Sequence, residues 1–233
     1  MKYLLIISLF LLFATFSFAQ DEVSDLLNSD LKDKNYFSMD ITWNTWDRRP
    51  IGLDLKAYSR GYNFSFVHDF QIGQSKFGAT VGLGIGTNNY YHDAFLSISN
   101  NDSASFYKIP DSISFKGTKL ATTYVDIPLE FRFKTKADEP SKSVNIAIGF
   151  KAGILVSSMV KYKGFDYLTN STNQLKVKFK DITAVNKYRY GITFRAGYSK
   201  INFFGYYALS TLFTKNKGLS IHPFSLGLTL TLP

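Results

Sequence analysis

The chain has 233 residues, a length that suits one domain of moderate size. It contains no cysteine, so disulfide frameworks, thiolate metal sites and cysteine nucleophiles are excluded. Its net charge is +9, and 17% of its residues are aromatic, including 22 Phe and 15 Tyr. Phenylalanine facing lipid, with tyrosine and tryptophan at the membrane interfaces, would account for that excess of aromatic residues.

The first residues have the form of a secretory signal peptide. Lys2 starts a short basic region, residues 3–18 form an almost unbroken apolar run, and small residues precede a cleavage point between Ala19 and Gln20. We therefore expect residues 1–19 to be removed on export, with an uncleaved membrane anchor as the alternative. Export argues against a nucleic-acid partner. Residues 20–34 are expected to form a polar periplasmic leader.

Residues 124–134 carry the clearest structural signal. Their odd positions are Val, Ile, Leu, Phe and Phe, and their even positions are Tyr, Asp, Pro, Glu, Arg and Lys. Side chains alternate across a strand, so this segment has one apolar face and one charged face. In a soluble sheet the apolar face would point inward. In a transmembrane β-barrel it points outward to lipid, and the charged face lines the lumen.

Similar alternation divides residues 35–233 into eight strands. The apolar positions change phase after residue 57, which requires a bulge or a bend near Gly61. In the fifth strand the apolar face consists of even positions up to Val160, and in the seventh it includes Phe213. The expected strands are 36–45, 58–71 with 51–57 as its extension beyond the bilayer, 75–90, 119–135, 143–160, 187–198, 201–213, and a last one that contains 224–232.

Connections of two lengths alternate along the chain. The short ones lie at 71–74, 136–141 and 199–200, and the longer ones include the polar loops 91–118 and 162–184. With the N-terminus in the periplasm, all three short turns and the C-terminus fall on the periplasmic side, as in bacterial outer-membrane barrels. The sequence therefore predicts an all-β fold, an eight-stranded antiparallel up-and-down transmembrane β-barrel with short periplasmic turns and longer extracellular loops.

The same orientation puts charged side chains of both signs into the lumen. An eight-stranded barrel has an interior just wide enough to hold side chains, and alternate glycines from Gly82 to Gly86 would leave room for bulky ones opposite. Because unpaired charges there would be costly, we expect a structural network that plugs the lumen. The expected lumen charges are Lys76 and the nine residues of the predicted site, Asp40, Asp69, Asp126, Glu130, Arg132, Lys134, Lys151, Arg189 and Arg195.

The sequence offers little for catalysis. The three histidines are His68, His92 and His222. His68 and Asp69 are neighbours in a strand and so point to opposite faces. His92 lies where the third strand leaves the membrane, near several serines, and is a candidate for a lipid-facing hydrolase, although a histidine at a barrel rim is more commonly just interfacial. We expect no enzyme activity, no metal site and no cofactor.

Several segments together resemble the PorT-like outer-membrane β-barrels of Bacteroidetes, often described as the porin family. The resemblance covers most of the mature chain and implies an outer-membrane location; one member of that family is tied to type IX secretion. The matching segments are 59–61, 75–77, 82–86, Tyr124-Val125-Asp126-Ile127-Pro128-Leu129-Glu130, 149–153, 188–191, 195–198, 207–213 and 227–228.

Three functions stay open on this reading. The first is a closed, non-enzymatic barrel that acts as a structural or partner-binding component of the envelope, with a role in secretion among the options. The second is a small passive channel. The third is a soluble lipocalin-like protein that binds an apolar ligand inside. The expected partners are outer-membrane lipid, lipopolysaccharide phosphates near the basic surface, and envelope or secretion-system proteins.

Overall fold

The computed structural model describes residues 34–49, 52–73, 75–99, 102–109, 115–136, 142–166 and 171–232. The expected signal peptide and nearly all of the expected leader lie outside these residues. The structure contains eleven strands within them, and all eight expected strands are present. In chain order they are β1 (Lys34–Asp47), β2 (Arg60–Gln71), β3 (Phe77–His92), β4 (Ala94–Ile98), β5 (Ala104–Lys108), β6 (Phe115–Lys134), β7 (Val144–Asp166), β8 (Ser171–Lys180), β9 (Tyr188–Tyr198), β10 (Ile201–Ala208) and β11 (His222–Leu232).

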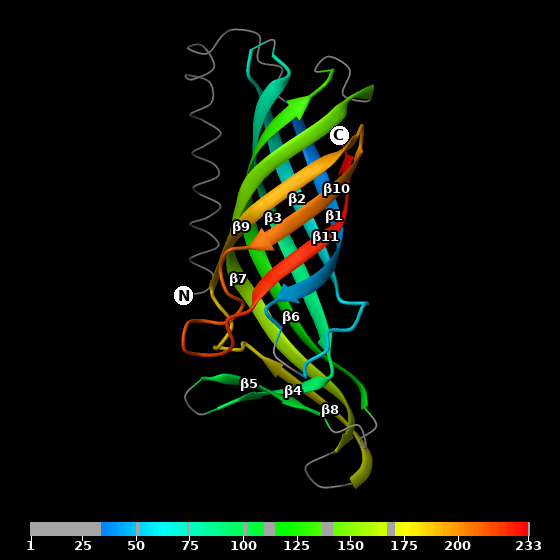
Figure 1. Cartoon of the computed structure of the whole chain (residues 1–233), viewed down its shortest axis with the longest axis vertical. Coiled ribbons are helices and arrows are strands. Elements are labelled where there is room, and N and C mark those ends of the chain that lie inside the picture. The colour runs from blue at the N-terminus through cyan, green and yellow to red at the C-terminus, as the bar shows by residue number, and fades with distance from the viewer. Residues whose placement is uncertain are drawn as a thin grey trace, which may run out of the picture.

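Eight of the strands form a closed antiparallel barrel (Figure 1). Their order is β6, β3, β2, β1, β11, β10, β9 and β7, and the pairing of β7 with β6 completes the ring. The first and last strands are neighbours, in a register that places Phe37 opposite Leu232 and Asp47 opposite His222. The predicted fold class is therefore confirmed.

The alternation places apolar side chains outside and polar ones inside. On β1, Phe37, Ile41 and Trp43 are exposed, while Asp40 and Thr42 between them are buried. Most of the other barrel strands repeat this pattern. The lipocalin-like alternative requires the opposite arrangement and is wrong for this structure. On β3 the exposed apolar positions end at Ile85, so the lipid-facing part of that strand ends there.

The two ends of the barrel differ in size. The turns after β2, β6 and β9 lie at one end, where β1 begins and β11 ends (Figure 1). The opposite end carries the long connections, which hold the separate hairpin β4–β5 and the strand β8. By the rule for bacterial outer-membrane barrels, the first end is periplasmic and the second extracellular. No helix in the described part of the chain is long and apolar enough to cross a membrane.

The long connections build a cap with its own apolar core. Trp46 contacts the rings of Tyr90 and Phe106 at centroid distances of 5.2 and 5.7 Å, and Phe106 contacts Phe213 at 5.9 Å. The cap core is the cluster of buried residues Trp46, Leu53, Tyr90, Ala94, Leu96, Ala104, Leu120, Val160, Ile182, Ala184, Val185, Leu212, Phe213 and Ile221. An apolar core at this end was not predicted from the polar composition of the loops.

Several expectations for this end are wrong. Residues 91–118 and 162–184 were expected to be loops, but they contain β4, β5 and β8 together with parts of β6 and β7. Residues 52–57 do not extend β2; they form a connection in which Leu53 is buried in the cap core and Leu55 makes a single bridge to His92. The seventh barrel strand ends at Ala208, because the chain then turns inward to bury Phe213.

A bulge in β7 places Val160 on the opposite face from the one expected. Tyr124 of β6 pairs with Leu155 of β7, but Thr123 pairs with Ser157, so Val156 is an extra residue on β7. Before the bulge the even positions of β7 face lipid, and after it they face inward. Val160 is therefore buried in the cap core rather than exposed on the outer face.

Candidate functional site in the barrel lumen

The nine predicted site residues lie on the inner face of five barrel strands. Asp40 is on β1, Asp69 on β2, Lys151 on β7, Arg189 and Arg195 on β9, and the other four on β6. All nine are buried or partly buried. Eight of them form ion pairs with one another, and Lys151 does not within the described residues. Lys76 is exposed beside the turn after β2, so its expected lumen position is wrong.

The innermost ion pair joins Asp126 of β6 to Arg189 of β9, across the strand between them. Arg189 Nε donates to Asp126 Oδ1 at 2.8 Å, and Arg189 Nη2 contacts the other carboxylate oxygen. In the register, Gly153 of β7 pairs with both residues. A Cβ at Gly153 would overlap Asp126 Oδ1, and one at Gly86 would lie 2.8 Å from Arg189 Nη2. Two glycines therefore leave the space that this ion pair fills.

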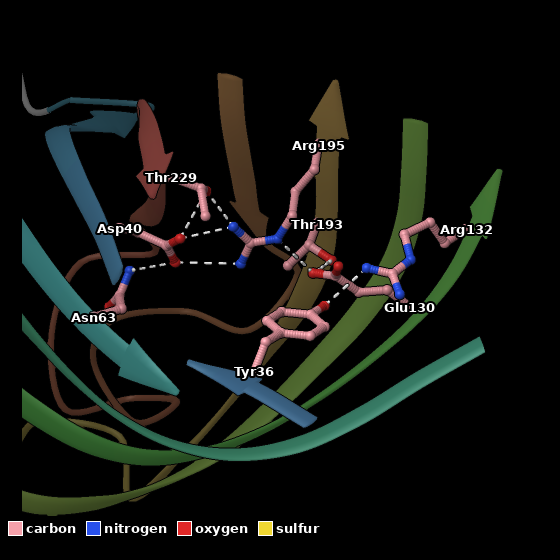
Figure 2. Close-up of polar contacts among 8 residues, drawn as sticks. All are labelled: Tyr36, Asp40, Asn63, Glu130, Arg132, Thr193, Arg195 and Thr229. Atoms are coloured by element: carbon pink, nitrogen blue, oxygen red, sulfur yellow. Dashed lines mark hydrogen bonds and ion pairs between the residues drawn. The ribbon is translucent and has the colours of Figure 1, made fainter. Parts of the chain in front are cut away.

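Arg195 is the centre of a second cluster that spans the lumen (Figure 2). Its Nη1 and Nη2 donate to the two carboxylate oxygens of Asp40 at 2.6 and 3.2 Å, and its Nε donates to Glu130 Oε1 at 2.9 Å. Asp40 and Glu130 are on β1 and β6, which are separated around the ring by two strands on one side and four on the other. One guanidinium thus links three separate parts of the wall.

Neutral groups complete the hydrogen bonding of this cluster. Thr229 Oγ1 donates to Asp40 Oδ1 at 2.8 Å, Asn63 Nδ2 donates to Asp40 Oδ2 at 3.4 Å, and Thr193 Oγ1 donates to Glu130 Oε1 at 3.3 Å. Buried charges are tolerable only when they are paired and their remaining hydrogen-bonding capacity is satisfied. The arrangement meets that condition for Asp40, Glu130 and Arg195.

Two further cations share Asp69 toward the periplasmic end. Lys134 Nζ lies 2.7 Å from Asp69 Oδ2, and Arg132 Nη2 contacts the same oxygen. Arg132 Nη1 also donates to Tyr36 Oη at 3.0 Å, and its guanidinium lies 5.4 Å from the centre of the Tyr36 ring. With two cations for one carboxylate, this part of the wall has a local excess of positive charge.

Lys151 lies against aromatic rings instead of a carboxylate. Its Nζ is 4.1 Å from the centre of the Tyr206 ring and 5.6 Å from that of Phe204. The guanidinium of Arg195 also lies over the Phe204 ring, 4.4 Å from its centre. An ammonium over an aromatic face is stabilised by the ring quadrupole, more so when it is removed from water. The inward-facing aromatic rings of β10 therefore stabilise the Lys151 ammonium, where a carboxylate partner was expected.

A cavity of about 370 Å³ opens below these clusters, on the side of the short turns. Arg195 and Glu130 line its inner end, and Lys34 and Lys200 line it where β1 begins and β9 turns into β10. Arg189 and Asp126 do not line the cavity. We call this space the vestibule. It reaches the Arg195 cluster from the periplasmic side, and the cap core lies beyond the opposite end of the barrel.

Several residues of the site were missed in the sequence. Tyr36, Asn63, Thr193 and Thr229 are polar residues on the inner faces, and their positions in the alternation could have identified them. The inward rings Phe204 and Tyr206 are harder to predict, because β10 carries large side chains on both faces and its alternation is weak.

His92 does not lie at a lipid-facing rim as expected. It is buried in the cap, in edge contact with Phe106 and 6.2 Å from the Trp46 ring. Neither ring nitrogen has a hydrogen-bond partner among the described residues, so the structure pairs it with no serine there. His68 faces outward, where Nδ1 contacts Asn35 Oδ1 at 2.6 Å. Within the described residues, no group of three or more acidic or imidazole side chains could hold a metal ion.

Comparison with known proteins gives a family match. The model of the outer membrane protein beta-barrel domain family matches residues 12–214. Solved structures that match the chain include Ail, the attachment invasion locus protein of Yersinia pestis, alone and in complex with the heparin analogue sucrose octasulfate. Each is 10% identical and covers 86% of this chain and 98% of its own, with TM-scores of 0.34 and 0.33. A mutant porin of Rh. blastica is 12% identical, over 87% of this chain and all of its own, with a TM-score of 0.19. No curated protein matches the chain.

Proposed function

Because the chain belongs to the outer membrane protein beta-barrel domain family, we propose that it is a barrel closed to solutes that serves as a structural or partner-binding component of the envelope. The observation that carries this proposal is the span of Arg195 across the lumen to Asp40 and Glu130. The Arg189–Asp126 pair and the cap core lie beyond it. These layers support the proposal that the vestibule is a blind space rather than the mouth of a pore.

Planar-bilayer recording tests closure directly. The purified full chain is expected to give no stable conductance steps, because the lumen of an eight-stranded barrel is filled by its side chains. Regular, voltage-independent steps from the wild-type protein would overturn the proposal and establish the small passive channel. The variant Arg195→Ala serves as a comparison, because a weakened brace should permit brief openings that the wild-type barrel does not show.

The finer assignment rests on the sequence. We place the chain among the PorT-like barrels of Bacteroidetes, exported with removal of residues 1–19, and the segment from Tyr124 to Glu130 supports this placement. A secretion-related role follows from the same resemblance. Affinity purification of the tagged protein from detergent-solubilised outer membranes tests it: recovery of the same secretion components in repeated purifications is expected. A protein that is recovered alone would contradict the role in secretion and leave the closed barrel unaffected.

The proposed role is non-enzymatic and needs no cofactor. The burial of His92 supports this view, since the residue considered for hydrolysis is enclosed by aromatic side chains. The partners we propose are the lipid and lipopolysaccharide of the membrane around the barrel, together with envelope proteins that contact the cap or the periplasmic rim.

A further inference from the structure

A row of lysines crosses the outer face of the sheet where β7 extends beyond the barrel. Lys161 of β7 pairs directly with Lys178 of β8, and Lys163 pairs with Lys176. On the other side of β7, Lys161 pairs with Lys119 of β6. Like charges directly opposite one another on neighbouring strands are destabilising. We call the exposed members of this set, Lys161, Lys163, Lys176, Lys178 and Lys180, the lysine ladder.

The ladder carries a charge that the described part of the chain does not balance. None of its five members forms an ion pair with a described residue. Lys119 at its side donates to Asn89 Oδ1 at 2.8 Å, which is a neutral partner. Several cations held about 5 Å apart on a flat strand pair form a suitable surface for a ligand with more than one anionic group.

The position of the ladder indicates where such a ligand lies. Ile154 and Val156 are the last exposed apolar residues on the outer face of β7 before the lysines, at 59% and 60% exposed, and the half-buried Met159 lies between the two groups. Lys161 follows five residues later, about 16 Å along a strand that rises about 3.3 Å per residue. Because barrel strands are tilted by about 45°, this corresponds to a height of about 12 Å above the apolar surface. Lysine side chains at that height can reach down to the headgroups of the same leaflet.

We infer that the lysine ladder binds the phosphate groups of lipopolysaccharide in the outer leaflet, an inference that rests on the outer-membrane role proposed above. Bound phosphates offset the repulsion between the paired lysines and hold the β7–β8 ribbon against the membrane surface. A soluble polyanion does not require its binding site to lie directly above the lipid-facing residues of the same strand.

The test compares two variants that lose the same charge. In one, the ladder residues Lys161, Lys163, Lys176 and Lys178 are changed to Gln; in the other, the exposed basic residues Arg48, Lys108, Lys187 and Lys215 are changed to Gln. Binding of fluorescent lipopolysaccharide to the detergent-purified full chain is measured for each. We expect the ladder variant to bind at least tenfold more weakly than wild type and the matched control to change less than twofold. Equal losses in the two variants would overturn the inference.

Four further measurements keep the result unambiguous. Lipopolysaccharide stripped of phosphate should bind wild type as weakly as the ladder variant binds the intact glycolipid. Heparin, a sulfated polysaccharide without lipid, should show a smaller dependence on the ladder, and a larger one would assign the site to soluble polyanions instead. Without lipopolysaccharide, the ladder variant should melt no lower than wild type, because its change removes repulsion; a lower melting temperature would contradict the argument from paired charges. Conductance of the same preparation reports on barrel closure independently.

Discussion

The lumen and the cap are enclosed by the same set of strands, but they are filled by side chains of opposite character. In the lumen, where lipid surrounds the wall, the enclosed side chains are charged, and Arg189 and Arg195 connect them through ion pairs. In the cap, beyond the lipid-facing part of the barrel, they are apolar and packed around Trp46 and Phe213. The difference follows from the solvent outside, because the apolar face of a strand turns toward lipid in a membrane and away from water elsewhere.

The strand β7 passes through both regions, and the face that its even positions occupy changes between them. Its even positions from Val144 to Val160 are apolar except for Ser158, yet they face lipid before the bulge at Val156 and the cap core after it. The bulge shifts the faces by one residue at the level where the surroundings change. A single alternation in the sequence therefore corresponds to two opposite orientations in the structure.

The largest expected effect comes from removing the charge that joins three parts of the lumen wall. Arg195→Ala leaves Asp40 and Glu130 buried without their cation and should cost about 3–5 kcal/mol of unfolding free energy. Urea unfolding in lipid, followed by the heat-modifiable gel shift of folded barrels, measures it. Lys76→Ala is the control, because that exposed residue should change stability by less than about 0.5 kcal/mol. Equal stability of the two variants would contradict the brace.

A core substitution in the cap should have a more local effect. Phe213→Ala removes a buried aromatic side chain and should cost the cap about 3 kcal/mol, since the cavity can close only in part. We expect faster hydrogen exchange in β4, β5 and β8 with an unchanged barrel melting temperature. Leu219→Ala, at a 40% exposed residue in the same connection, is the matched control. A fall in barrel melting would show that the two regions are not independent.

The space around the inner ion pair gives a third test. Gly153→Ala places a methyl group on Asp126 Oδ1 and should cost about 2 kcal/mol through overpacking. Gly205→Ala is the matched control, because a Cβ there meets only Leu226 and Phe194, at 3.8 and 4.0 Å. Both variants are compared by urea unfolding. A control that loses as much as Gly153→Ala would attribute the effect to strand glycines in general.

The smallest expected effect is a response of the cap to acid. His92 lies in the cap, beyond the lipid-facing part of β3, and burial lowers its pKa to about 4, with the Ala94 backbone and the Asp93 carboxylate opposing this shift only in part. The neutral form thus favours the folded cap above the unfolded pKa of about 6.5, and stability is lost as pH falls toward 4. At pH 5.5 the loss should be roughly 1 kcal/mol. Hydrogen exchange of the cap at pH 7 and 5.5 measures it, and His92→Phe should respond less to acid than wild type does.

Strand pairing and face assignment could be predicted because lipid imposes one rule on most barrel strands. Glu130 and Arg132 were assigned to the lumen from two-residue periodicity together with the alternation of short and long connections. The partners of these charges could not be predicted, since Arg189 reaches Asp126 across β7 only because the register sets Gly153 between them. The association of Lys151 with aromatic rings depends likewise on the inward orientation of Phe204 and Tyr206 on a strand with weak alternation.

The cap could not be predicted because its apolar residues follow no shared period. Leu53, Ile182 and Ile221 come from connections far apart in the chain, each surrounded by polar residues. Only the closed barrel brings these connections together at one end. The sequence rule that polar segments form surface loops holds for most of their residues and fails for the few that are buried in the core.

The pairing of β1 with β11 has a consequence for how the chain reaches its folded state. Phe37 and Leu232 are neighbours in the barrel but 195 positions apart in the chain (232 − 37). The wall therefore cannot close until β11 has been exported, and until then two strand edges and the lipid-facing aromatic side chains are without their final surroundings. Such a long-range closing contact implies slow folding and a chain that must be kept from aggregating on its way to the membrane. Loss of β11 would remove every pair between β1 and residues 222–232 and leave the ring open at its seam.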